Sequence, residues 1–132
     1  MKRGAGGILL KEGKILLGKR ASNRKHYPNV WDIIGGHCLP GEELPDTLVR
    51  ELREEINVTP KAFKYLNVLH ELQPELYGER EYHIYLVTGW IGKDPIVLGG
   101  EHSEIGWFSI EEAIRLDLAH PGYTEIFKTI KQ

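Results

Sequence analysis

Cysteine is almost absent from this chain: Cys38 is the only one among 132 residues. A single thiol cannot form an internal disulfide, so the fold must depend on a packed core rather than on cross-links. A lone thiol also fits a reducing compartment, and we expect a cytoplasmic protein. Lys2 and Arg3 precede an apolar run, but glycines interrupt this run and Lys11 ends it, which argues against a signal peptide.

Long apolar runs and clusters of one charge are missing as well. No stretch approaches the length of a membrane-spanning helix, so we expect no membrane association. The net charge is −2, and no group of Lys and Arg residues is extensive enough to predict a nucleic-acid groove. No repeat, low-complexity tract or Pro-rich linker divides the chain, so we expect one domain over residues 1–132. The pattern leaves open whether the protein is a monomer or a homodimer.

Charge is instead concentrated in one segment, where a glycine-rich loop runs into an amphipathic helix within residues 36–58. At about 100° per residue, one arc of this helix is apolar. This arc contains Leu48, Val49, Leu52 and Ile56. The neighbouring arc carries Glu51, Glu54 and Glu55, whose mutual repulsion destabilises a helix unless a cation offsets it. Oxygen ligands of this kind favour Mg²⁺, with Mn²⁺ as the alternative ion.

The ordinary alternative for such a run is a solvated acidic face. Arg50 argues against this alternative, because its guanidinium can hold the neighbouring carboxylates in place. The preceding loop, residues 35–41, is rich in glycine and lets backbone approach a ligand closely.

The segment resembles the Nudix box, G-x5-E-x7-R-E-U-x-E-E-x-G-U, in which U is a bulky aliphatic residue. Every specified position but one matches, namely Gly36, Glu42, Arg50, Glu51, Leu52, Glu54, Glu55 and Val58. Asn57 takes the place of the last glycine. Because Asn tolerates the left-handed conformation, we expect Asn57 to end the helix as the glycine would. The resemblance implies an α/β protein with the Nudix α/β/α sandwich around a mixed β-sheet.

The resemblance also implies hydrolysis of a nucleoside diphosphate linked to another group, a small-molecule nucleotide cut at phosphorus with Mg²⁺ present. Glu54 and Glu55 are the expected metal ligands, together with the carbonyl of Gly36. Glu51 completes the metal cluster or accepts the proton of the attacking water. Arg50 is expected to orient these carboxylates.

Two further residues have expected roles around this helix. Glu42 is expected to brace the junction of loop and helix. Related hydrolases also take a carboxylate from a later loop. Glu101 is the favoured candidate here, because the glycine pair before it gives the loop freedom, and Glu104 is the alternative.

Several substrate classes remain open. The short chain favours a MutT-like enzyme, which converts a nucleoside triphosphate to a monophosphate and pyrophosphate. Pro74 lies in a loop comparable to one in ADP-ribose and nucleotide-sugar pyrophosphatases, the main enzymatic alternative. Residues 20–32 resemble isopentenyl diphosphate isomerase, but Gly35 stands where that enzyme needs a cysteine. A non-catalytic nucleotide sensor commonly loses box carboxylates, which this chain keeps.

The aromatic residues and histidines have two interpretations. Tyr27, Trp31 and Tyr82 can stack on a nucleobase, although aromatics on strands more often belong to a core. His37, in the glycine-rich loop, can approach a substrate. The other histidines show no spacing typical of metal ligands.

Periodicity predicts the remaining elements. Strands are expected over residues 4–10, 14–19, 30–34, 61–70 and 79–91, with loops over 21–29 and around Pro74. A helix begins near Pro45, and residues 109–112 form a capping box that opens a later helix. A last helix is expected over residues 123–130. Strands first, one central helix and late helices predict a sheet layered between helices.

Overall fold

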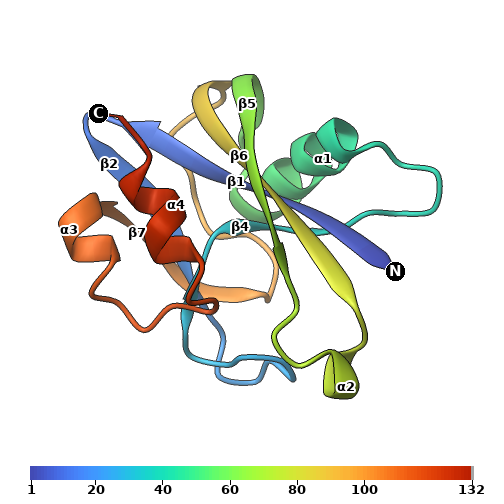
Figure 1. The fold of residues 1–132 in the computed structure, drawn as a ribbon. Coiled ribbons are helices and arrows are strands. Elements are labelled where there is room, and N and C mark those ends of the chain that lie inside the picture. The colour runs from blue at the N-terminus through green and yellow to red at the C-terminus, as the bar shows by residue number, and fades with distance from the viewer. Residues whose placement is uncertain (132) are drawn as a thin grey trace.

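The computed structural model describes residues 1–131; residue 132, the last of the predicted domain, lies outside the described residues. The strands are β1 (Lys2–Lys11), β2 (Lys14–Arg20), β3 (Trp31–Asp32), β4 (Ile34–His37), β5 (Thr59–His70), β6 (Arg80–Ile91) and β7 (His102–Ser109). The helices are α1 (Leu44–Ile56), α2 (Pro74–Tyr77), α3 (Ile110–Ala113) and α4 (Tyr123–Lys128). Helix α1 lies on one side of the sheet, and α3 and α4 lie on the other (Figure 1).

The sheet is mixed, as the family resemblance implied. Its main path runs β3-β2-β1-β6-β5, while β4 also pairs with β1 and β7 also pairs with β2. The pairing of β1 with β6 is parallel, from Lys2 opposite Arg80 onward, and the other pairings are antiparallel. Strand β1 therefore pairs with β2, β4 and β6. The glycine-rich segment of β4 lies beside this central strand.

Alternation along the strands separates two cores. Ile8 of β1 packs in the cluster beneath α3 and α4, which contains Phe127, whereas its neighbour Leu9 packs in the cluster beneath α1, which contains Leu52. Successive side chains of a strand point to opposite faces, so one strand supplies both cores. The same alternation occurs in β2 and β6. The two cores on opposite faces of one sheet confirm the predicted sandwich.

Helix α1 is fixed by its apolar arc and by its ends. Leu48, Leu52 and Ile56 are fully buried against the sheet, and each contributes about 1.5–3 kcal/mol of hydrophobic stabilisation. Proline near the first helical position begins the helix without losing a hydrogen bond. Asn57 ends it in the left-handed region, with φ 60° and ψ 37°, and its N–H donates to the carbonyl of Leu52. The predicted role of Asn57 as a left-handed C-cap is confirmed.

Substitution of Asn57 tests this cap. We expect Asn57→Gly to leave the free energy of unfolding unchanged within about 0.5 kcal/mol, because both residues accept positive φ. Asn57→Val should lower it by about 1–2 kcal/mol, because a β-branched side chain clashes in the left-handed region. Urea unfolding measures both values, and equal stability of the two variants would contradict the assignment.

The structure differs from the sequence prediction in four elements. Strand β7 was not predicted; it forms because its residues pair antiparallel with all of β2. The strand expected over 30–34 is divided into β3 and β4, which pair with different neighbours, β2 and β1. Residues 74–77, expected as loop, form the short helix α2. The last helix ends at Lys128 rather than at residue 130.

Other predictions about local structure hold. Ser109 and Glu112 form the predicted capping box, each side chain bonding to the other's backbone N–H. Strands β1, β2, β5 and β6 occupy the predicted segments within two residues at each end. None of the helices within residues 1–131 has the length and apolar character that crossing a membrane requires.

Candidate functional site

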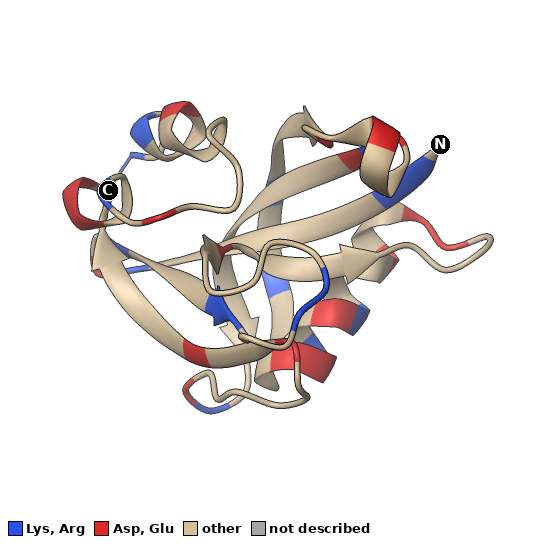
Figure 2. Cartoon of the chain, turned by 90° about the horizontal axis from the view of Figure 1, so that it is seen from below, with Lys and Arg blue, Asp and Glu red and all other residues tan. Residues whose placement is uncertain are grey.

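Three carboxylates from two segments meet beside α1. Glu51 and Glu55 project from the helix, and Glu101 precedes β7; one ligand oxygen of each lies within 4.8 Å of the others. Acidic residues gather along this helix (Figure 2). Glu54 is outside this cluster, and its side chain is 55% exposed. Glu104, the alternative to Glu101, is exposed on β7 and also lies outside.

Backbone hydrogen bonds explain why Glu101 reaches the helix. The N–H of Leu98 donates to the carbonyl of Glu55 at 2.8 Å, and the N–H of Ile96 donates to the carbonyl of Ile56 at 3.2 Å. The segment before β7 thus satisfies carbonyls that the end of the helix leaves without partners. Gly99 then turns the chain with φ +62°, a conformation that favours glycine.

Arg50 holds the acidic side of the helix together. Its guanidinium binds Glu42 with two hydrogen bonds of 2.9 Å and donates to the carbonyl of His37 at 2.9 Å. It also lies 3.4 Å from Glu51 and 3.3 Å from Glu54. The paired guanidinium lowers the pKa of Glu42 to about 2. Arg50 therefore contacts carboxylates, and Glu42 ties the loop to the helix.

Glu42 makes two further contacts that brace this junction. One of its oxygens accepts from the backbone N–H of Leu39 at 3.0 Å and from the hydroxyl of Thr47 at 2.7 Å. The carboxylate is therefore shared between the loop, the first turn of α1 and Arg50.

Glu55 is the carboxylate of the cluster that has no arginine or lysine beside it among the described residues, whereas Arg50 lies near Glu51 and Arg24 near Glu101. Burial and the neighbouring Glu101 raise the pKa of Glu55 to about 8. Burial also raises the pKa of Glu51. Among the described residues, Oε1 of Glu55 is a buried oxygen without a hydrogen-bond donor, and the nearest ring nitrogen, Nδ1 of His102, is 3.7 Å away. Burial lowers the pKa of His102, so that ring favours its neutral form.

An unpartnered buried oxygen within a repelling carboxylate group is the arrangement expected of a site for a hard cation. Glu51, Glu55 and Glu101 thus fit Mg²⁺ or Mn²⁺ in donor type and in charge.

Gly36 leaves the space that Glu51 occupies. A Cβ at Gly36 would lie well inside van der Waals contact with the carboxylate of Glu51. Gly36 pairs with Ala5 across β4 and β1, so the backbone at this point is held against the sheet. Only glycine allows the carboxylate to lie directly on the strand.

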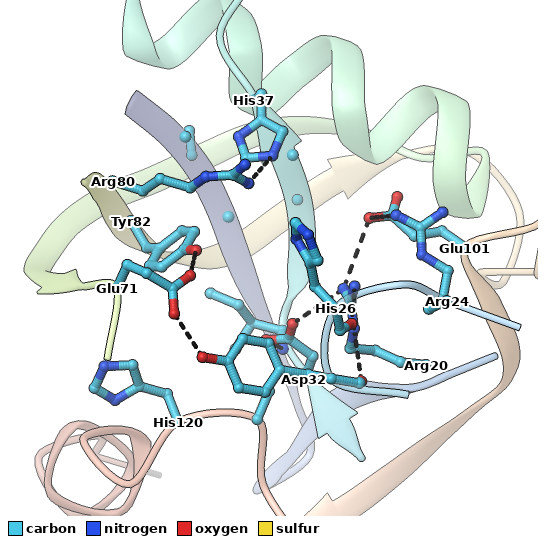
Figure 3. Close-up of a pocket in the computed structure, with 18 of the residues that line it drawn as sticks. Arg20, Arg24, His26, Asp32, His37, Glu71, Arg80, Tyr82, Glu101 and His120 are labelled. Atoms are coloured by element: carbon cyan, nitrogen blue, oxygen red, sulfur yellow. Dashed lines mark hydrogen bonds and ion pairs between the residues drawn. The ribbon is translucent and has the colours of Figure 1, made fainter. Parts of the chain in front are cut away.

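A cavity of about 160 Å³ extends from the cluster between β1, β4, β6 and the loop before β3. Its lining includes Arg20, Arg24, His26, Tyr27, Asp32, Gly36, His37, Glu71, Arg80, Tyr82, Glu101, His120 and Tyr123. Figure 3 shows the charged and aromatic side chains that surround it. Glu101 belongs both to this lining and to the carboxylate cluster, so the cavity and the cluster form one continuous site.

The lining of the cavity contains both arginine side chains and carboxylates. Arg24 lies 3.7 Å from Glu101, and Nη1 of Arg80 lies 2.9 Å from Nε2 of His37. Nη1 of Arg20 lies 3.6 Å from Asp32 and 3.9 Å from Glu101; Asp32 also accepts from the hydroxyl of Tyr123 at 2.5 Å, and burial raises the pKa of Asp32. Arg20 and Arg24 therefore lie beside Glu101, with Asp32 on the far side of Arg20, and Arg80 lies by His37.

Sequence reasoning missed several lining residues. Asp32 carried a usable signal, because a carboxylate between two apolar residues of a short strand is unusual in a core. Arg20, Glu71 and Arg80 stand where no local pattern singles them out. Among the aromatic candidates, Trp31 packs edge-on against Phe108 at 5.0 Å in the core.

Tyr27 and Tyr82, the other two aromatic candidates, line the cavity, as does His37. These three side chains can therefore contact a ligand that enters the cavity.

A family profile and a known protein both match most of this chain. A NUDIX domain family profile matches residues 1–130. The nucleoside triphosphatase NudI of Enterobacter sp. (strain 638) is 31% identical over 123 residues, with 84% of each chain covered.

Solved structures share the fold. The MutT NUDIX hydrolase of Burkholderia pseudomallei superposes with a TM-score of 0.82 at 23% identity, covering 98% of each chain. The NUDIX domain of Shewanella oneidensis NrtR, solved with ADP ribose, gives a TM-score of 0.76 at 20% identity, covering 96% of this chain and 85% of that one.

Proposed function

Because this chain belongs to the Nudix family and is a Nudix hydrolase, we propose that it converts a nucleoside triphosphate to a monophosphate and pyrophosphate in a Mg²⁺-dependent reaction. The observation that carries the proposal is the continuity of the carboxylate cluster with the cavity through Glu101. The name of the Enterobacter relative, a nucleoside triphosphatase, supports the choice of substrate.

The cluster is the proposed metal site, with Glu51, Glu55 and Glu101 as ligands. Glu54 and the carbonyl of Gly36 are further candidates that complete the set. When bound, Mg²⁺ neutralises phosphate charge and makes water a better nucleophile. The buried oxygen of Glu55 without a donor supports this assignment, because a cation is the partner it lacks.

The remaining roles fall to side chains around the cluster. Arg24 and Arg80 are proposed to bind phosphate oxygens, because both line the cavity and also the wider opening beside it that includes Glu55 and Glu101. Arg50 keeps Glu51 and Glu54 oriented through its 3.4 and 3.3 Å contacts. Glu51 is the candidate, as the alternative to its role as a ligand, for accepting the proton of the attacking water. The inner end of the cavity is proposed to hold the nucleoside.

ADP-ribose is a second candidate substrate. A wider mouth of about 650 Å³ opens beside the cavity and is lined by Arg24, Lys25, Arg80 and Glu101. This mouth gives space for a second sugar beyond the diphosphate. The NrtR domain with ADP ribose supports the idea that a fold of this kind accommodates such a ligand.

The position of the cut bond tests the proposal. We expect a nucleoside triphosphate hydrolysed in ¹⁸O-labelled water with Mg²⁺ to give monophosphate and pyrophosphate, with one label in the two products. The physical reason is that a nucleoside seated in the cavity places the phosphates nearest the sugar beside the cluster, where water is activated. Mass analysis of both products gives the answer. Orthophosphate as the primary product from every active triphosphate contradicts the proposal, and turnover of ADP-ribose alone selects the second candidate.

A further inference from the structure

The loop between β2 and β3, residues 21–30, covers the cavity and is held from two sides. On one side, Arg20 at the end of β2 holds the loop. Its Nε donates to the carbonyls of His26 and Tyr27 at 3.1 and 3.0 Å, and its Nη2 donates to the carbonyl of His26 at 2.7 Å. Tyr27 has φ 51°, a left-handed conformation that is costly for a residue with a side chain. The loop keeps this conformation because its surroundings hold it.

On the other side, the loop is held by Glu71, which directly follows β5. This carboxylate is only 8% exposed. One oxygen accepts from the hydroxyl of Tyr27 at 2.5 Å and from the N–H of Gln73 at 3.2 Å, and the other accepts from the hydroxyl of Tyr82 at 2.7 Å. Burial by itself raises the pKa of Glu71, but these hydrogen bonds more than offset it, so the pKa is lowered.

Glu71 is unusual because it is a buried anion without an ion pair, although the more distant charge of Arg80 also helps to lower its pKa. It makes no ion pair with any of residues 1–131. Buried charges are normally paired, since desolvating an anion is costly. Its partners are instead two tyrosine hydroxyls and a backbone N–H, and one of those hydroxyls belongs to the loop.

Neighbouring contacts dock the loop on the connection between β5 and β6. The amide of Gln73 donates to the hydroxyl of Tyr27 at 3.1 Å. The ring of His26 lies 4.0 Å from that of Tyr77 in α2, and the ring of Tyr27 lies 5.6 Å from it. Two segments that are far apart in the sequence therefore meet at the cavity, and Glu71 is the charged residue at their junction.

The loop also reaches the carboxylate cluster. Arg24 lies 3.7 Å from Glu101, and Arg20, which also holds the loop, lies 3.9 Å from Glu101. In Figure 3 these two arginines approach Glu101 on one side of the cavity, and Glu71 and Tyr82 lie on the opposite side. A shift of the loop at Tyr27 would move both the cavity wall and Arg24.

We propose that Glu71 is a positioning residue: through the hydroxyl of Tyr27 it fixes residues 21–30 over the cavity, so that the loop is preformed to bind the nucleoside and to keep Arg24 beside Glu101. Glu71 does not touch the reacting atoms. The inference rests on the proposed function, because it assigns the loop to the substrate of that site. A preformed loop binds substrate without the cost of ordering it.

Kinetics of Tyr27→Phe and Glu71→Gln test the inference. Each variant is expected to raise KM about tenfold at saturating Mg²⁺, the effect of losing one hydrogen bond to a charged group, while kcat changes less than twofold. Tyr65→Phe is the matched control. It removes a tyrosine hydrogen bond of 2.9 Å to His83, outside the cavity, and should leave KM unchanged.

Two readouts separate positioning from a loss of overall stability. Backbone amides of residues 21–30 should exchange faster in Tyr27→Phe than in Tyr65→Phe, while those of α1 are unaffected. The double variant should have nearly the KM of Glu71→Gln alone, because both changes remove the same contact. If Glu71→Gln fails to fold, Tyr27→Phe with its control still gives the kinetic and exchange results.

Unchanged KM in Tyr27→Phe, or exchange that does not differ from the control, overturns the inference. The kinetics are run on whichever substrate, triphosphate or ADP-ribose, the wild-type protein hydrolyses. Absence of triphosphate turnover by the wild type therefore counts against the proposed function, whereas an unchanged KM on the hydrolysed substrate counts against Glu71.

Discussion

The Glu55→Gln protein is expected to fold normally and to lose about a thousandfold in kcat at saturating Mg²⁺, equivalent to about 4 kcal/mol in the barrier. An amide has nearly the shape of the carboxylate but carries no charge, so it weakens a metal site while filling the same space. Without metal the variant should be at least as stable as the wild type at neutral pH, because the amide is uncharged beside Glu51 and Glu101, whereas the carboxylate of Glu55 must take up a proton on folding.

Glu104→Gln is the matched control for this experiment. Glu104 lies only three positions beyond Glu101, yet it is exposed and outside the cluster. Its replacement should leave kcat unchanged. Urea unfolding of both variants, with turnover measured over a range of Mg²⁺ concentrations, separates catalysis from stability. Normal turnover of a folded Glu55→Gln protein would remove Glu55 from the metal site.

The second large effect is a loss of stability with rising pH when no metal is present. Burial and Glu101 raise the pKa of Glu55 to about 8, above the ordinary 4.5 of the unfolded chain. The protonated form is therefore favoured by the folded state. The stability that this provides is complete below the unfolded pKa and is lost as pH rises through the folded one. The slope is at most about 1.4 kcal/mol for each pH unit and has fallen by half at the folded pKa, so the loss between pH 7 and pH 8.5 is about 1.2 kcal/mol.

This window avoids the histidines. Burial lowers the pKa of His37 and of His102, so their contribution changes at lower pH and has the opposite sign. Urea unfolding in EDTA should show the decline for the wild type and a flatter curve for Glu55→Gln. Saturating Mg²⁺ should reverse the trend, because the ionised carboxylates are the form that binds it. A wild-type curve parallel to that of Glu55→Gln in EDTA would contradict the raised pKa.

Local pattern was sufficient for the elements that carry strong periodicity or end signals. Helix α1 was predictable from its apolar arc and from Asn57, because both act within a few residues of the chain. Strand β7 was not, since its alternation is weak and its partner β2 is far away in the sequence. The break between β3 and β4 depends on two different neighbouring strands, which no single segment encodes.

In the candidate site, too, contacts within one segment could be expected from the sequence, and contacts between distant segments could not. That Arg50 lies beside Glu51 and Glu54 could be expected from one helix, whereas its ion pair with Glu42 appears only in the structure. Glu101 could be named as a candidate, but its place in the cluster depends on the hydrogen bond from Leu98 to Glu55, a contact set by tertiary structure. Glu71 could not be identified from the sequence, because its proposed role depends on hydrogen bonds from Tyr27 and Tyr82 that only the folded structure brings together.

The late position of Glu101 has a consequence for biosynthesis. A ribosome extends the chain from the N-terminus, so Glu51 and Glu55 emerge well before Glu101 does. Parallel pairing of β1 with β6 also joins distant segments, and such contacts form slowly. A nascent chain that has not yet exposed residue 101 therefore carries an incomplete carboxylate cluster. The proposed metal site is therefore complete only after residue 101 has left the ribosome and the segment before β7 has docked on α1.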